Sequence, residues 1–255
     1  MLQMGRPGRF LQGTCLALLL GLVVTMIAVS FALHRDRELA AYLMKENGPF
    51  ELIGFASCIG ATIMLALACA RYFKRQAKAL AFWCGLLALG FFMIGMEEIS
   101  WGQSFFAWTT PEVFSANQQS ETNLHNMGFI HLRAHDIGIT LLALYFVVLP
   151  TAYAGVKAVQ TTIDRIELPV PPLAVSMLFA ACFVFFQILF SVNYHNSQGV
   201  PINYGEMQEF VYQICFLVFA WSEFARAGSA IADPAWRKST NPQQSSRTPS
   251  RPVFA

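Results

Sequence analysis

The chain has 255 residues, of which 55% are hydrophobic and only 13% are charged, about half the charged fraction of an ordinary globular domain. A soluble fold of this length could not cover so much apolar surface with polar side chains, so we expect a lipid bilayer to surround much of it. The formal net charge of +2 leaves no basic stripe for nucleic acid, which we exclude as a partner.

Six apolar stretches approach the roughly 20 residues that a membrane-spanning helix needs. In chain order they are 10–33, 50–70, 79–96, 137–156, 172–192 and a shorter one at 210–225. The first stretch follows Arg6 and Arg9 like a signal peptide, but it is longer than a signal core and charged residues follow it directly. We therefore predict an all-α fold, a bundle of about six transmembrane helices formed by residues 1–226.

The Lys and Arg residues between these stretches predict the orientation of the bundle. Most of them, such as Arg71, Lys74, Arg75 and Lys78, fall on the same side as both chain ends. Positive charge is typical of the cytoplasmic side, so both termini are predicted to be cytoplasmic in a bacterial inner membrane. The tail 227–255 is rich in Ser, Pro, Gln and Arg and is predicted to be disordered, beside anionic lipid or free in solvent.

With this topology, the histidines and most acidic residues fall together on the outer, extracytoplasmic side. Ionisable groups near lipid are expensive to desolvate and normally face a bundle interior or a wet cavity. The acidic residues concerned are Glu51, Glu97, Glu98, Glu121, Asp136, Glu206 and Glu209, and the histidines are His34, His125, His131, His135 and His195.

The densest group of candidate catalytic residues ends the third stretch, in Met-Glu-Glu-Ile-Ser-Trp-Gly-Gln at 96–103. In a continuous helix, Glu97, Ser100 and Trp101 share one face and Glu98 points about 100° away. Two adjacent carboxylates cannot both ionise cheaply in a low-dielectric site, so one of Glu97 and Glu98 is a candidate general acid. Ser100 is a weaker candidate nucleophile, because no G-x-S-x-G elbow surrounds it. The alternative is an interfacial tryptophan beside two solvated glutamates.

A long outer loop, 104–130, follows this segment and is predicted to cover the site. Its polar residues Glu121, Asn123 and Asn126, with Gln103 and Trp101 before it, are candidates for binding. The alternative is ordinary loop chemistry, in which Asn and Thr satisfy turns.

Two histidines at the start of the fourth stretch have the spacing of a metal site. His131 and His135 are four residues apart, which places both imidazoles on one helix face, as in zinc sites. His125 or His195 would supply a third ligand. Asp136 is a further binding candidate, although it lies three residues after Arg133 and the two could form an ion pair.

The last two stretches and the start of the second add polar residues at the same level. Tyr194 lies at the outer end of one helix, Glu206 and Glu209 begin the next, and Glu51 begins the second stretch. Such stripes often serve helix packing through hydrogen bonds. Because several of them end together, we predict a shared polar cavity open to the outer side.

The motifs E-E-I-S-W-G-Q at 97–103, T-P-E at 110–112 and E-T-N-L-H-N at 121–126 resemble those of a family of bacterial multi-spanning membrane proteins. That family implies a helical membrane fold and no particular reaction. A weaker likeness, in chemistry alone, is to membrane hydrolases of the alkaline ceramidase type, which gather Glu, Ser, Asp and His around zinc. This chain departs from them because its H-x-x-x-H element is in the fourth helix.

The leading functional hypothesis is a membrane-embedded, metal-dependent hydrolase or transferase acting on a lipid or a periplasmic small molecule. Zinc would activate water, and Glu97 or Glu98 would move the proton. A second hypothesis is a non-catalytic binding or assembly protein of the inner membrane. A third, a proton-coupled carrier of small solutes, is disfavoured because the inner halves of the helices are almost purely apolar.

Overall fold

The computed structural model describes residues 17, 20–21, 24–29, 36–43, 45, 47–115, 117, 120, 122–124, 127, 137–196 and 205–229. Within this part of the chain every extended element is a helix, and one isolated antiparallel bridge joins Asn117 to Met127. The prediction of an all-α protein is confirmed for these residues.

Within the described residues, three helices are long and apolar enough to cross a membrane, which indicates a membrane protein. They are α3 (Pro49–Lys74), α4 (Lys78–Glu98) and the segment Ile137–Gly155. At 1.5 Å per residue, the 26 residues of α3 extend about 39 Å, more than the hydrocarbon thickness of about 30 Å. Each of the three begins and ends within a few residues of a predicted stretch.

The other predicted stretches correspond to helices or lie largely outside the described residues. Helix α9 (Leu173–Asn196) covers the fifth stretch and α10 (Gly205–Ser229) the sixth. Helix α10 begins five residues before the predicted stretch and ends at Ser229, so its last turn includes residues 227–229, which the sequence pattern had assigned to the disordered tail. Residues 24–29 of the first stretch are helical.

The remaining elements are short. Helix α2 (Arg37–Leu43) precedes α3, and α8 (Lys157–Ile166) links the segment Ile137–Gly155 to α9. The 3-10 turns η1 (Ser100–Gly102) and η2 (Glu112–Phe114) and the helix α5 (Gln103–Phe106) lie after α4. The segment Ile137–Gly155 contains a π-turn, η3 (Leu144–Val148), followed by α7 (Leu149–Gly155).

The π-turn has a local cause in the sequence. Pro150 lies within two residues of the start of α7, lacks a backbone N–H, and would clash with the carbonyl group four residues earlier, that of Phe146. A wider turn relieves this clash without ending the helix.

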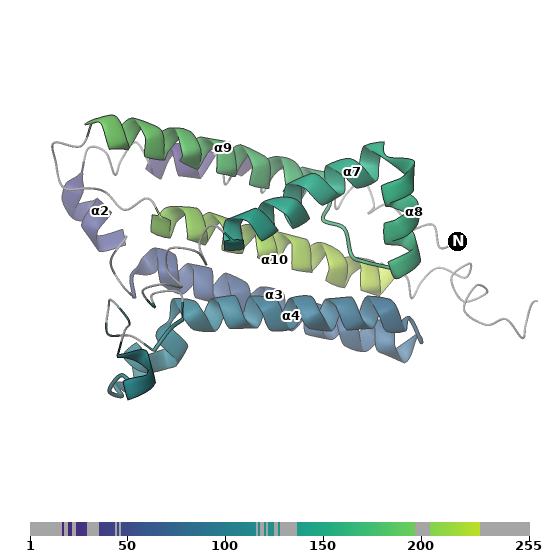
Figure 1. Cartoon of the computed structure of the whole chain (residues 1–255), viewed down its shortest axis with the longest axis horizontal. Helices are drawn as coiled ribbons and strands as arrows, with labels where there is room; N and C mark the ends of the chain where they lie inside the picture. The colour runs from purple at the N-terminus through teal and green to yellow at the C-terminus, as the bar shows by residue number, and fades with distance from the viewer. Residues whose placement is uncertain are drawn as a thin grey trace, which may run out of the picture.

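The long helices lie roughly side by side, with α3 against α4 on one side and α10 on the other (Figure 1). Glycines permit the close approach. A Cβ added at Gly95 of α4 would lie 2.8 Å from the Cβ of Cys58 on α3. Such contacts of small residues are how membrane helices bring their backbones together.

Substituting Gly95 tests this contact. We expect Gly95→Ala to lower the free energy of unfolding by about 1–3 kcal/mol, because the new methyl group meets a Cβ that can move only with its helix. Gly90→Ala on the same helix is the matched control, since nothing lies within 4 Å of its added Cβ. Unfolding of both variants in increasing SDS would contradict the assignment if they lost equal stability.

A layer of stacked aromatic rings fills the middle of the bundle. Phe91 of α4 stacks on Phe216 of α10 with ring centroids 4.6 Å apart. Phe146, in the π-turn, lies 5.4 Å from Phe216 and 5.1 Å from Phe179 of α9. All four rings are buried. Aromatic contacts of this kind stabilise beyond the area that they bury, and here they connect four helices.

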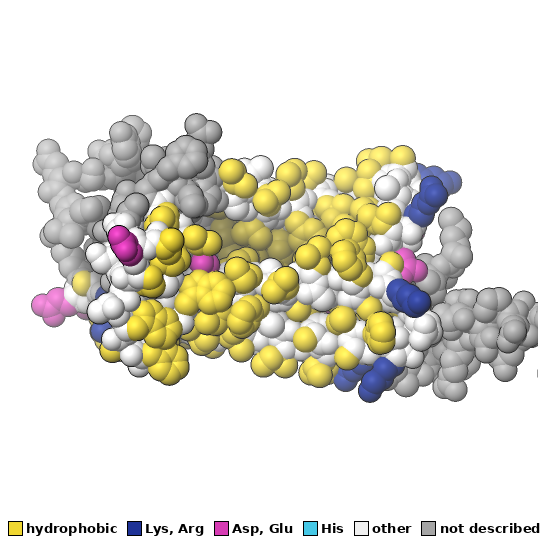
Figure 2. Space-filling view, turned by 60° about the horizontal axis from the view of Figure 1, so that its bottom comes forward, with side chains coloured by type: hydrophobic (Ala, Val, Ile, Leu, Met, Phe, Trp, Pro, Cys, Tyr) yellow, Lys and Arg dark blue, Asp and Glu magenta, His cyan; other side chains and the backbone are white. Residues whose placement is uncertain are grey.

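The two ends of the bundle differ in charge. One end, which we call the loop end, holds the start of α3, the end of α4, the start of α10 and the segment that follows α4. The other, the basic end, carries Arg71, Lys74, Arg75 and Lys78 around the α3–α4 turn. Figure 2 shows Lys and Arg side chains gathered at that end.

Candidate functional site

Four glutamates lie near one another at the loop end, where α3 and α10 begin and α4 ends. Glu98 is the last residue of α4, Glu51 lies in the first turn of α3, and Glu206 and Glu209 lie near the start of α10. The carboxylates of Glu51, Glu206 and Glu209 all lie close enough to Glu98 for their charges to act on it. We call these four residues the carboxylate cluster. The antiparallel course of α4 explains their proximity, since its C-terminus joins two helix N-termini.

Gln213 of α10 holds Glu98 in place. Its side-chain amide donates a hydrogen bond to the Glu98 carboxylate, while the Gln213 side chain is 2% exposed. The amide oxygen Oε1 packs directly against Gly54 of α3, where an added Cβ would lie 1.6 Å from it. This oxygen is buried and has no hydrogen-bond partner among the described residues.

Asn47 provides a second contact at the edge of the cluster. Its backbone N–H donates a hydrogen bond to a Glu51 carboxylate oxygen. Its side-chain oxygen Oδ1 is buried and has no hydrogen-bond partner in the described part of the chain. Two amide oxygens beside the carboxylate cluster therefore have no donor among the described residues.

Glu97, next to Glu98, has a different environment. One of its oxygens accepts a hydrogen bond from the indole N–H of Trp101 at 2.8 Å, and the other accepts one from the backbone N–H of Leu124 at 2.6 Å. The carboxylate thus joins the end of α4 to the loop that follows it. The two adjacent glutamates, which the sequence could not distinguish, separate into one in the cluster and one that anchors the loop.

The helix does not continue through the Glu97–Gln103 motif, contrary to the arrangement assumed from its spacing. Helix α4 ends at Glu98, and Ser100, Trp101 and Gly102 have φ angles of 47°, 58° and 89°. Such positive angles favour glycine, which occupies the largest of the three. The chain therefore turns sharply at this point, and Trp101 reaches Glu97 from a turn rather than from the helix face.

Ser100 takes part in a buried network of side-chain hydrogen bonds. Its hydroxyl accepts a bond from the amide of Asn123 at 2.9 Å, and Asn117 donates to the Asn123 amide oxygen at 2.8 Å. All three side chains are buried. Ser100 and Asn123 therefore stabilise the folded loop. This is the role expected if the polar residues of the segment serve only the structure of the loop.

Gln103 joins two more parts of the same loop. Its amide group donates to Thr110 Oγ1 at 2.9 Å and accepts from the Thr122 backbone N–H at 2.6 Å. The indole of Trp108 also donates to Thr122 at 3.3 Å. The polar residues of the motif therefore fold the loop back on itself beside the cluster.

Loosening the Glu97 anchor should expose the loop. We expect Glu97→Gln to speed hydrogen exchange of the Leu124 amide by about tenfold or more, because one carboxylate oxygen becomes an amide N–H that cannot accept its bond. Glu112→Gln, at an exposed position in the same loop, should leave that amide unchanged. Equal exchange in both variants, followed by mass spectrometry, would contradict the anchoring role.

Several predicted site residues lie outside the described residues. They are Glu121, His125, Asn126, His131, His135 and Asp136, and for Tyr194 and His195 only the helical backbone of α9 is described. The proposed zinc ligands are therefore not placed. Within the described residues, no group of three or more His, Cys, Asp or Glu side chains lies close enough to hold a metal ion.

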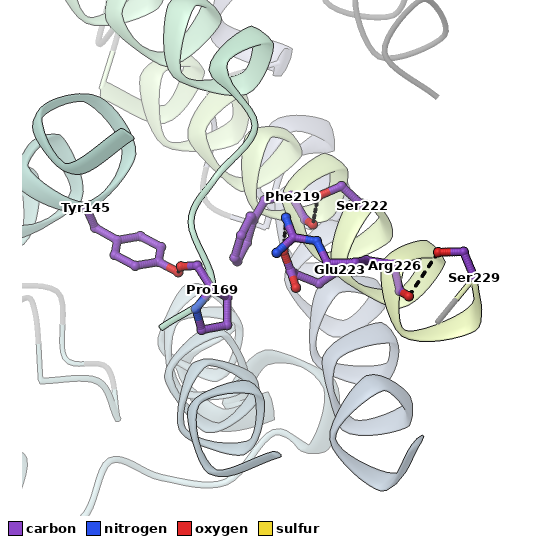
Figure 3. A network of polar contacts seen from close by, with 7 residues as sticks. All are labelled: Tyr145, Pro169, Phe219, Ser222, Glu223, Arg226 and Ser229. Carbon is purple, nitrogen blue, oxygen red and sulfur yellow. Dashed lines mark hydrogen bonds and ion pairs between the residues drawn. The ribbon is translucent and has the colours of Figure 1, made fainter. Parts of the chain in front are cut away.

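A second buried polar group lies near the basic end, and sequence reasoning gave it little weight. Glu223 of α10 is fully buried and forms an ion pair with Arg226 at 2.9 Å (Figure 3). Tyr72 of α3, which lies near Glu223, has a buried hydroxyl without a hydrogen-bond partner among the described residues. Nearby, Arg71 donates to the Phe224 carbonyl at 3.0 Å and lies over its ring. The pair is thus part of a helix contact.

The structure also identifies Gln213 and Gly54 as site residues. Gln213 is four residues after Glu209 and seven after Glu206, so helical spacing places the three on one face. Gly54 is three residues after Glu51 on α3. The helical spacing from Glu206 and Glu209 is the sequence signal that points to Gln213. Nothing in the sequence indicates that Gly54 packs against the Gln213 side chain.

No family model, curated protein or solved structure matches this chain. The likeness of the Glu97–Asn126 motif to a bacterial membrane family stays a prediction, and the functional argument depends on the geometry of the site.

Proposed function

We propose that the protein is a hydrolase or transferase embedded in the bacterial inner membrane, with its reaction centre at the carboxylate cluster. The observation that supports this best is the environment of Glu98. Gln213 donates a hydrogen bond to its carboxylate, and Glu51, Glu206 and Glu209 on two other helices lie close enough for their charges to act on it. Glu98 is the proposed proton donor and acceptor in the reaction.

The chemistry follows from the crowding of like charges. Carboxylates that share a poorly hydrated site repel one another, so not all of them ionise, and the group keeps a proton available for transfer. Positioned proton transfer of this kind typically contributes 10²–10⁴-fold to a rate. The substrate would be a lipid, or a small molecule on the periplasmic side. Membrane lipid would surround the protein in either case.

The proposal places the loop end outside the cytoplasm. In this topology α9, α10 and the first apolar stretch also cross the membrane, giving six spanning helices with both termini cytoplasmic. The basic residues around the α3–α4 turn support it, since such residues concentrate on the cytoplasmic side. Labelling of Gln76→Cys and Glu112→Cys in intact cells tests it, because an impermeant thiol reagent should reach only the second.

Zinc bound by His131, His135 and either His125 or His195 remains part of the proposal. It would lower the pKa of a bound water towards 7 and supply the nucleophile. Glu98 is the better partner for it, because both Glu97 oxygens already accept hydrogen bonds. Metal analysis of the purified protein decides this point. Equal metal content in the wild type and the His131→Ala, His135→Ala variant would remove zinc from the mechanism.

A carrier of protons or solutes fits the distribution of polar groups along the bundle less well. The aromatic layer of Phe91, Phe146, Phe179 and Phe216 lies between the cluster and the Glu223–Arg226 pair, and an ion path needs polar groups along its whole length. A binding or assembly protein is the stronger alternative, because the Gln213 and Asn47 amide oxygens, which have no donor among the described residues, would serve binding as well as chemistry.

Comparison of cell extracts separates an enzyme from a binding protein. The wild type, Glu98→Gln and Glu112→Gln would be expressed at equal levels in a bacterial host, and lipid and periplasmic extracts compared by mass spectrometry. We expect the wild type and Glu112→Gln to change the same species and Glu98→Gln to change none. Identical extracts from all three, with folded protein in each, would favour the binding role instead.

A further inference from the structure

The segment that follows α4 exposes large aromatic side chains. Phe105 and Phe106 of α5 are 57% and 75% exposed, and Trp108 just beyond them is 39% exposed. The rings of Phe106 and Trp108 stack with their centroids 5.6 Å apart, and Phe105 adjoins them in the chain. We call these three residues the aromatic face. An exposed apolar surface on a folded protein that is more than a single side chain often marks an interaction site.

The length of α4 gives the depth of the aromatic face in a membrane. The 21 residues of α4 extend about 32 Å, close to the hydrocarbon thickness of about 30 Å. Lys78 begins the helix and Glu98 ends it, so both of its ends are suited to a head-group layer. The chain turns sharply after Glu98, and α5 begins five residues later, at Gln103. The aromatic face therefore lies close to the same head-group layer as Glu98.

The composition of the segment fits a head-group layer better than open water. Residues 99–111 contain no Asp, Glu, Lys, Arg or His, so insertion would remove no ionised side chain from water. The indole N–H of Trp108 donates to Thr122 at 3.3 Å, which leaves the apolar part of the ring for an outside partner. Aromatic side chains with one polar edge concentrate at the boundary between membrane and water.

The aromatic face also adjoins a helix that is itself suited to lipid. Phe106 packs on the turn at Gly102, where an added Cβ would lie 3.2 Å from its ring. The neighbouring Trp101 contacts Phe92 of α4, with ring centroids 6.5 Å apart, and α4 is long and apolar enough to span a membrane. In Figure 1 the segment after α4 (dark teal) lies beyond the end of α4 and to one side of the bundle, and Figure 2 shows hydrophobic side chains at the loop end beside the apolar face of the helices. A bilayer around α4 would therefore reach the aromatic face.

We propose that the aromatic face inserts among the lipid head groups and anchors the segment after α4 to the surface of the bilayer. The bilayer is the occupant that the depth, the lack of charge and the adjoining spanning helix favour together. This inference goes beyond the proposed function and does not depend on it, because the anchor requires no reaction. Since Gln103 and Trp108 both bind Thr122, the anchor holds the loop around Thr122 at the membrane surface.

Fluorescence quenching of the full-length protein in liposomes tests the anchor. Phe105→Cys and Phe106→Cys would each carry a thiol-linked NBD fluorophore, and Glu112→Cys, at an exposed position of the same loop, is the matched control. The wild type, labelled in parallel, gives the background of the native cysteines. The liposomes would contain phosphatidylcholine with a nitroxide near the top of one acyl chain. We expect this lipid to quench the labels at 105 and 106 about threefold more than the label at 112, because only the first two would lie among lipids. Iodide in the water should quench in the reverse order.

The other patterns of quenching overturn the proposal and say what replaces it. If iodide quenched the labels at 105 and 106 as strongly as the label at 112, the aromatic face would be in water. If neither iodide nor the nitroxide lipid reached those two labels, protein would cover the face, either a second copy of this chain or another part of the same chain. Each labelled variant must keep the wild-type melting temperature to within a few degrees. With two labelled positions, the result does not depend on one substitution being tolerated.

Discussion

Replacing Glu98 with glutamine should slow the reaction by about 100-fold or more. Glutamine keeps the size of the side chain and can still meet the Gln213 amide through its own oxygen, but it cannot take up or release a proton. Loss of positioned proton transfer typically lowers a rate by 10²–10⁴-fold. The rate would be measured as conversion of the species that distinguishes wild-type extracts.

The adjacent glutamate provides the matched comparison. Glu97→Gln should lower the rate much less, because Glu97 anchors the loop through Trp101 and Leu124. Both variants must keep the wild-type melting temperature to within a few degrees for the comparison to hold. If Glu97→Gln abolished activity and Glu98→Gln retained it, the roles assigned to the two carboxylates would have to be exchanged.

Replacing Arg226 with methionine should lower the free energy of unfolding by about 3–5 kcal/mol. Glu223 is fully buried, and Arg226 is the cation paired with it at 2.9 Å. Removing one partner of a buried pair leaves the other charge without compensation, which is far more costly than losing the attraction alone. Unfolding of the purified protein in SDS, followed by circular dichroism, would measure the loss.

A double variant separates the cost of leaving Glu223 unpaired from the loss of any other contacts that Arg226 makes. Glu223→Leu with Arg226→Met should recover most of the lost stability, because replacing a buried ion pair by apolar side chains is often neutral. Arg165→Met on α8, where the arginine is exposed, is the control for losing a cation at this end and should change stability by less than about 1 kcal/mol. A double variant as unstable as Arg226→Met alone would show that Arg226 stabilises the fold through other contacts.

The membrane helices could be predicted because their signal is local. Residues 50–70, 79–96 and 137–156 are continuous apolar runs, and their lengths match the bilayer. The convergence of Glu51, Glu98, Glu206 and Glu209 at one end was predictable in outline, since a bundle with alternating helix direction returns acidic helix ends to the same level. In the structure, the charges of Glu51, Glu206 and Glu209 act on Glu98.

The different roles of Glu97 and Glu98 at the end of α4 could not be predicted from the sequence. Glu97 and Glu98 are chemically identical neighbours, and their roles depend on where the chain turns. That turn has positive φ at Ser100 and Trp101 as well as at Gly102, and only the glycine signals it in the sequence. The scaffold role of Ser100 likewise depends on Asn123, which is 23 residues away along the chain.

The contact between Gly54 and Gln213 has a consequence for sequence variation in related chains. Since a methyl group at position 54 would overlap the amide oxygen at position 213, the two positions should vary together. A chain that gains alanine or a larger residue at 54 must shorten or redirect the side chain at 213, and it then loses the donor that holds Glu98. In an alignment, glycine at 54 should therefore accompany glutamine at 213, and chains that have changed both should also have changed the residue at 98.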